Sequence, residues 1–236
     1  MMYDATLDVY NFRREYSLGE TDAIDCKSLL LRLNIITLFR QLSQDFSGMC
    51  IKSKDKKFML INYDQCIGRQ NFTIAHELYH LFVQQNFKPH ICNPGVIKDT
   101  EENKADKFAS CFLMPEMGIK SLIPTGELTS RNISIPTILK LEQYYQVSHT
   151  AMSIRLREIG VINEDRKKYL ESLRITQTAR LYGFDTSIYL SGNKDLNVGD
   201  YGVIAKEMYD KLKISESHYI SLMELIGIDV TKQGDE

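Results

Sequence analysis

Apolar and polar residues follow two different spacings along the chain, and the changes between them predict where helices and strands lie. Residues 5–17 and 22–33 carry apolar side chains at helical spacing. Three stretches rich in β-branched and aromatic residues follow at 34–42, 48–52 and 57–63, and the polar turn SKDK joins the last two. We therefore expect two helices followed by a small three-stranded antiparallel sheet.

Helical spacing returns after the predicted sheet and continues to the end of the chain. It predicts helices at about 71–85 and 100–114, and Pro115 ends the second of them. The stretch LIPTGELTSRN is typical of a turn-rich linker, and beyond it amphipathic helices are expected at about 137–145, 150–159, 164–182, 200–212 and 217–226. The fold class is therefore α+β, with a mixed unit at 1–125 and an all-helical C-terminal region at 126–236.

Composition narrows the class of protein without naming a partner. The 236 residues are 43% hydrophobic and 25% charged, with a net charge of −2, so no global positive field favours nucleic acid. The five cysteines are scattered without a CxxC pair, which indicates a reducing compartment. The longest apolar segment, SLLLRLNIITLF, is interrupted by Arg32 and Asn34 and is too short to span a bilayer. We expect a soluble cytoplasmic protein that is not bound to a membrane.

The stretch NFTIAHELYHLF, at residues 71–82, carries the most specific chemical signal. On an α-helix, His76 and His80 lie about 40° apart around the axis, so both imidazoles can reach one ion. With Glu77 this is the HExxH pattern, in which two histidines bind Zn²⁺ and the glutamate accepts a proton from water. The competing interpretation is a pair of core histidines. A carboxylate is costly to bury in an apolar helix without a charged partner, and a metal beside Glu77 explains its presence.

A catalytic zinc site needs a third protein ligand, and the next predicted helix offers one. In TEENKADKFASCFLMP, Glu102 lies on the same face as Ala109, and the small Ala105 and Ala109 allow close helix approach. Spacing alone leaves Glu101 open as a competitor, because both glutamates lie in the first turn. Glu102 could also belong to a capping box with Asp99.

Four other residues are weaker candidates for the site. Tyr63 and Tyr79 could stabilise an oxyanion, although tyrosine at such positions packs more often than it reacts. His90 and Cys92 could touch a metal, but HExxH already supplies the histidines, so we expect an ordinary loop at HIC.

The two predicted helices together resemble the ImmA/IrrE metallopeptidases. RQNFTIAHELYHLF followed by ENKADKFASCFLMP is similar to that family's pattern, HExxH and then ExxA[DN]xFAxxxLMP. The resemblance implies a zincin-like fold for 1–125, with His76, His80 and Glu102 as zinc ligands and Glu77 as general base. It also implies that Asp106 hydrogen-bonds a ligand histidine, which would fix the ring orientation.

The resemblance extends into the C-terminal region. The segment ISIPTILKLEQYYQVSHTAMSIRLREIGVI is similar to the part that follows the peptidase unit in this family, and 137–160 resembles a helix-turn-helix. Its second helix carries only Arg155 and Arg157 as cations, offset by Glu158, which is a poor footprint for reading a DNA groove. We expect a structural or protein-docking role, and we do not expect direct DNA binding.

These patterns lead to two hypotheses about function. The first is a zinc endopeptidase whose extended substrate adds to an edge strand at KFMLINY. The resemblance implies that this substrate is a helix-turn-helix transcriptional repressor, cleaved to relieve repression, often one of a mobile genetic element. The alternative is a non-catalytic regulatory or antitoxin-like binding protein with a structural zinc site. The sequence pattern does not indicate an oligomeric state.

Overall fold

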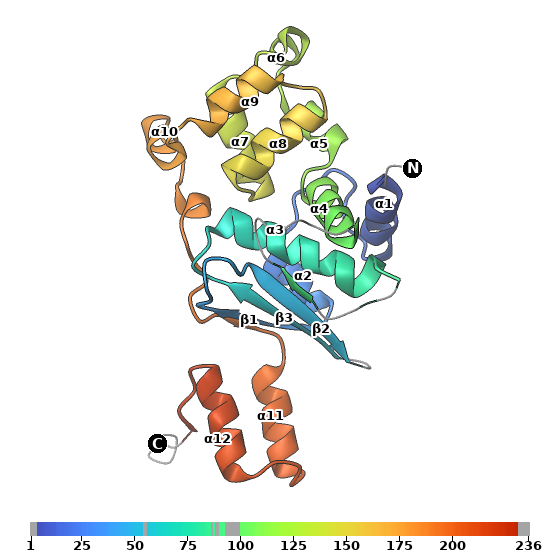
Figure 1. The fold of residues 1–236 in the computed structure, drawn as a ribbon, viewed down its shortest axis with the longest axis vertical. Helices are drawn as coiled ribbons and strands as arrows, with labels where there is room; N and C mark the ends of the chain where they lie inside the picture. The colour runs from blue at the N-terminus through green and yellow to red at the C-terminus, as the bar shows by residue number, and fades with distance from the viewer. Residues whose placement is uncertain (1–3, 54–55, 86, 88–89, 93–99, 231–236) are drawn as a thin grey trace.

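The structure is a computed structural model that describes residues 4–53, 56–85, 87, 90–92 and 100–230 (Figure 1). Its helices are α1 (Thr6–Glu15), α2 (Cys26–Arg32), α3 (Ile67–Leu78), α4 (Thr100–Leu113), α5 (Glu116–Leu122), α6 (Thr125–Ser130), α7 (Ile135–Tyr145), α8 (His149–Glu158), α9 (Glu164–Glu171), α10 (Ile175–Leu181), α11 (Tyr201–Asp210) and α12 (Glu216–Leu225). Two further segments are the π-helical η1 (Tyr79–Val83) and the 3₁₀-helical η2 (Ser187–Tyr189). Within the described residues, no helix is both long and apolar enough to cross a membrane.

The strands form one sheet, and it differs from the predicted one in size and direction. They are β1 (Ile35–Arg40), β2 (Gly48–Ser53), β3 (Lys56–Asn62), β4 (His90–Cys92) and β5 (Asn197–Val198), in the order β4-β2-β3-β1-β5. The β2–β3 hairpin is antiparallel as expected, but β3 lies between β2 and β1 and pairs with β1 in parallel. The expectation of three antiparallel strands is therefore wrong. The two added strands are too short to leave an alternating pattern in the sequence.

The parallel pairing depends on how the chain crosses from β1 to β2. The side chain of the buried Asn62, at the end of β3, donates hydrogen bonds to the carbonyls of Leu42, Ser43 and Phe46 at 3.4, 3.0 and 2.8 Å. Its Oδ1 accepts a hydrogen bond from the backbone N–H of Leu42 at 3.3 Å. One amide thus satisfies the backbone of the loop that passes over the end of β3, which leaves room for β3 between its neighbours.

One hydrophobic core joins the residues on both sides of the predicted boundary at 125. The helices α2 and α3 lie on the same side of the sheet, over β1 and over β2–β3 respectively, and α4 packs against α3 (Figure 1). Leu30 and Ile61 belong to the same buried cluster as Tyr145 and Leu156. The chain then returns to the sheet, where Val198 of β5 pairs with Thr37 of β1. The expectation that 126–236 is all-helical is therefore wrong at β5.

The predicted helices have the right type, but several boundaries differ, and the helix expected at 22–33 begins only at Cys26. The helix that carries HExxH begins at Ile67, four residues earlier than expected, with Cys66 as its N-cap. The expected linker at 122–132 contains α6, and α5 lies just before it, because Pro115 and Pro124 each stand at the N-cap of a new helix. Proline fits the start of a helix as well as it ends the one before. The single helix expected at 164–182 is divided into α9 and α10.

Gly68 explains how closely the start of α3 approaches the turn between α7 and α8. A Cβ on Gly68 would lie 2.4 Å from the backbone nitrogen of Ser148 and 2.5 Å from the carbonyl carbon of Val147. Beside it, the side-chain amide of Asn71 donates to the carbonyl of Gln146 at 2.8 Å. The α7–α8 turn is therefore fixed against α3 through backbone atoms on one side and a side-chain hydrogen bond on the other.

Alanine at position 68 should destabilise the protein, because the added methyl group meets backbone that has no rotamer to change. We expect Gly68→Ala to lower the free energy of unfolding by about 1–3 kcal/mol in urea titrations. Gly126 in α6 is the matched control, since a Cβ there has no atom within 4 Å. Gly126→Ala should raise stability by up to about 1 kcal/mol. Equal effects of the two substitutions would contradict the close approach at Gly68.

A buried polar network ties α7, α8, α9 and η2 together. The Nδ1 of His149 lies 2.6 Å from Oε1 of Glu142, and its Nε2 lies 2.9 Å from the carbonyl oxygen of Leu170. The hydroxyl of Tyr189 donates to the other carboxylate oxygen of Glu142 at 2.5 Å. Burial alone would lower the pKa of His149, but the bonds to Glu142 and Leu170, with the nearby charge of Glu171, raise it overall. The imidazolium form therefore suits this site.

The network predicts a specific dependence of stability on pH. Because the pKa of His149 is raised on folding, its contribution is complete below its unfolded value of 6.5 and is lost as pH rises through the folded pKa. We expect His149→Gln to lower the unfolding free energy by about 1–3 kcal/mol near pH 6 and by less near pH 9. Urea titrations of both proteins at the two pH values measure this. An equal loss at both would exclude the protonated form.

Candidate metal centre

The two histidines of HExxH lie on consecutive turns of one helix, at the point where its hydrogen bonding changes. His76 is in the last turn of α3, and His80 is in the π-helical η1, where the backbone N–H of Gln84 donates to the carbonyl of Tyr79 at 2.9 Å. Both rings are buried, each with 1% of its surface exposed. Single π turns inside α-helices occur often at functional sites.

Three side chains from two helices converge at this point. Glu102 of α4 places one carboxylate oxygen 3.2 Å from Nε2 of His76 and the other 3.2 Å from Nε2 of His80. The two Nε2 atoms are 3.1 Å apart. Ligands bound tetrahedrally to zinc at about 2.0–2.1 Å lie about 3.3 Å from one another. The separations between these atoms therefore fit a zinc ion with three protein ligands.

Hydrogen bonds on the far side of each ring fix its tautomer. Nδ1 of His76 lies 2.9 Å from Oδ1 of Asp106, and Nδ1 of His80 lies 2.8 Å from Oε1 of Gln84. Both partners are acceptors, so each Nδ1 carries the proton and each Nε2 presents a lone pair. Lone pairs that face each other and a carboxylate at about 3 Å are stabilised by a cation between them. The structure thus places Asp106 where the resemblance implied it, and Gln84 was missed although it lies four residues after His80.

The competitor for the third ligand, Glu101, points elsewhere. Its carboxylate accepts a hydrogen bond from the hydroxyl of Tyr79 at 2.8 Å and pairs with the ammonium of Lys104 at 2.6 Å. The bond from Lys104 is the main cause of a lowered pKa of Glu101. Geometry therefore brings Glu102, and not Glu101, to the two histidines. The capping-box alternative involves Asp99, which lies outside the described residues.

The tyrosines considered as oxyanion donors have other contacts. Tyr79 is 3% exposed, and its hydroxyl is engaged with Glu101. Burial, and then the bond to Glu101, raises the pKa of Tyr79 above its usual value. Tyr63 is half-buried and packs against the hydrophobic core. The hydroxyl of Tyr79 is thus directed to Glu101 and not to the two histidines.

Glu77 lies in the helix between the two histidines, and its side chain is 0% exposed. The strand β2 passes beside it, since Sγ of Cys50 lies 3.8 Å from the carbonyl oxygen of Glu77. A carboxylate so fully removed from water is held beside the converging ligands of the neighbouring turns. The role of general base stays a prediction for Glu77.

Two expectations about the strands near the site are corrected. HIC at 90–92 is strand β4, paired with Gly48–Cys50 of β2, and not a loop; the side chains of His90 and Cys92 lie outside the described residues. The stretch KFMLINY belongs to β3, which lies between β2 and β1. It is not an edge strand, so no substrate can add to it there.

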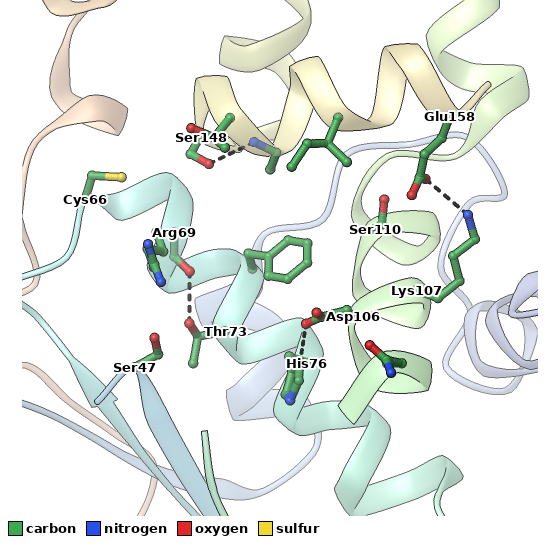
Figure 2. Close-up of a pocket in the computed structure, with 15 residues that line it drawn as sticks. Ser47, Cys66, Arg69, Thr73, His76, Asp106, Lys107, Ser110, Ser148 and Glu158 are labelled. Carbon is green, nitrogen blue, oxygen red and sulfur yellow. Dashed lines mark hydrogen bonds and ion pairs between the residues drawn. The ribbon is translucent and has the colours of Figure 1, made fainter. Parts of the chain in front are cut away.

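A pocket of about 500 Å³ opens beside the metal centre (Figure 2). It lies between α3, α4 and α8. His76, one of the three candidate ligands, and its partner Asp106 line the end of the pocket at the candidate metal centre. On α3 the face that carries His76 continues through Thr73 and Phe72 to Arg69, at helical spacing. Sequence reasoning missed this pocket, because its third wall comes from a helix that lies far away along the chain.

A mixed sheet beside a helix that presents two histidines to a carboxylate on the next helix is the arrangement of a metallopeptidase-like protein. A family model, Peptidase_M78, described as the IrrE N-terminal-like domain, matches residues 32–157. The match covers more than half of the chain, and the protein belongs to this peptidase family. The resemblance to ImmA/IrrE proteins is therefore confirmed. A comparison with curated proteins found no match.

Proposed function

We propose that this protein is a zinc-dependent endopeptidase that cleaves a cytoplasmic protein partner, a helix-turn-helix transcriptional repressor, and so relieves repression. The observation that carries the proposal is the convergence of Nε2 of His76, Nε2 of His80 and the Glu102 carboxylate to within 3.1–3.2 Å of one another. The peptidase family supplies the reaction class. The repressor as substrate rests on the resemblance to ImmA/IrrE proteins.

Each side chain of the site has a definable part in such a reaction. His76, His80 and Glu102 would hold the ion, and Asp106 keeps the His76 ring in the required tautomer. When bound, zinc supplies Lewis-acid chemistry that polarises a peptide carbonyl and acidifies water. Glu77 takes the proton of the attacking water and delivers it to the leaving amine nitrogen.

The contacts of α8 support a protein substrate over DNA. Arg155, one of its two cations, is buried and donates to the carbonyl of Met114 at 3.0 Å. The other, Arg157, pairs with Glu164 at 2.9 Å. Arg155 is thus withdrawn from the surface, and the exposed charge of Arg157 is offset by Glu164, which leaves little positive charge for phosphate contacts. The helix packs against α3 and α9 instead.

The test compares the proteomes of cells that carry the native protein with those of cells that carry Glu77→Gln. We expect one repressor to yield a pair of fragments only with the native protein, cut in an exposed flexible segment. If Glu77→Gln still relieves repression without a fragment, the protein acts by binding, as a regulatory protein with a structural metal site. The full chain is used, because the core extends across residue 125.

A further inference from the structure

The outer wall of the pocket is formed by the second helix of the helix-turn-helix-like segment. Ala151 and Ile154 of α8 and its N-cap Ser148 line the pocket together with Phe72 of α3. Figure 2 shows Ser148 and Glu158 on the α8 side of the pocket and Thr73 and His76 on the α3 side. The close approach at Gly68 and the bond from Asn71 to Gln146 fix this wall relative to the helix that carries the metal ligands. The face of α8 that carries Ala151, Ile154 and Glu158 therefore looks into the pocket beside the candidate catalytic centre.

The lining of the pocket combines apolar side chains with a few charged ones. Phe72, Ala151 and Ile154 form an apolar patch, and Ile154 is 40% exposed. Lys107 and Glu158 neutralise each other with an Nζ–Oε2 distance of 3.1 Å. The Asp106 carboxylate is engaged with Nδ1 of His76 at 2.9 Å. The exposed guanidinium of Arg69, by contrast, makes no hydrogen bond or ion pair with any residue that the structure describes.

The spacing on α3 sets the distance between this cation and the metal centre. Arg69 precedes His76 by two helical turns, which is about 10 Å along the axis. An extended peptide advances about 3.3 Å per residue, so about three residues cover that distance. A substrate segment that lies along α3 would bring one side chain onto the apolar patch and a later one to Arg69.

We propose that this pocket is the specificity site of the peptidase and binds an extended segment of the protein substrate. The segment carries an apolar side chain that packs between Phe72 and Ile154, and an acidic side chain, about three residues from the scissile bond, that pairs with Arg69. This proposal rests on the proposed function, because only an endopeptidase has a scissile bond from which the acidic side chain is counted. It assigns α8 a role in substrate recognition in place of DNA binding.

The test measures binding separately from cleavage. The zinc-loaded Glu77→Gln protein is titrated into short fluorescein-labelled peptides that carry a leucine followed about one or two residues later by glutamate, glutamine or lysine, because Phe72 lies only one helical turn from Arg69. Anisotropy should show the glutamate peptide binding about tenfold more tightly than the lysine peptide. In the background of Glu77→Gln, Arg69→Glu should reverse this order. Ile154→Asn should weaken all three peptides by similar factors.

Matched controls lie on α10, outside the pocket. Arg180 is an exposed arginine and Leu181 an apolar side chain that is 80% exposed. Arg180→Glu and Leu181→Asn should leave the peptide preference unchanged. If Arg69→Glu keeps the preference for glutamate, or Arg180→Glu reverses it as strongly, the assignment is overturned. Cleavage of the same peptides by the native protein reports on the proposed function alone, so either idea can fail without the other.

Discussion

Glutamine at position 77 is expected to leave zinc bound and to remove nearly all peptide-bond cleavage. Glu77 is fully buried beside the candidate ligands, and glutamine has almost the same shape but cannot accept the proton of water. We expect kcat to fall on the order of 10³-fold while KM changes little, measured with the purified protein and a quenched fluorescent substrate. Zinc stoichiometry by elemental analysis should be unchanged.

The control for this experiment is the conservative change to aspartate. Glu77→Asp keeps the carboxylate but shortens its reach, so it should retain more activity than Glu77→Gln. If Glu77→Gln keeps full turnover with its zinc in place, Glu77 does not move the proton. If it loses the zinc, the variant tests the metal site and not the base, and Glu77→Asp then decides the matter through its pH profile.

The second large effect concerns the third ligand. Replacing Glu102 by glutamine should weaken zinc binding by more than about a hundredfold, because the carboxylate that bridges His76 and His80 loses its charge. Glu101→Gln is the matched control, one residue away and in the same helical turn. It should change zinc affinity by less than about tenfold, since that carboxylate bonds to Tyr79 and Lys104.

Competition with a chromophoric zinc chelator measures both affinities on the same scale. The reverse ranking would move the ligand to Glu101 and would require the Tyr79 contact to break on metal binding. A similar loss in both variants would show that the whole first turn of α4 is needed to hold the ion. Only the predicted ranking agrees with the distances in the structure.

The grouping of the candidate ligands could be predicted in part from the sequence, because the spacing of the two histidines is local. His76, Glu77 and His80 belong to one helix, where separations of one and four residues set the direction of each side chain. The choice between Glu101 and Glu102 was not local. It is decided by Tyr79 and Lys104, which attract the carboxylate of Glu101 away from the histidines.

The parts of the fold that were missed all depend on contacts between distant segments. The parallel pairing of β1 with β3 is accompanied by hydrogen bonds from the buried Asn62 to the loop after β1, and in the sequence Asn62 looks like an ordinary turn residue. The pocket requires α8 to lie against α3, and the only trace of this in the sequence is a glycine, Gly68, inside a helix. Helical periodicity records which face is buried, but not what covers it.

The short strands at the two margins of the sheet have a consequence for handling the protein. The outermost strands, β4 and β5, contain only three and two residues, and they cover parts of the longer β2 and β1. Short outer strands offer few free backbone groups to another molecule, which limits edge-to-edge aggregation. A truncation before Asn197 would uncover Thr37 and Leu38 of β1. Shortened forms of the chain should therefore end after residue 198 if they are to remain monodisperse at high concentration.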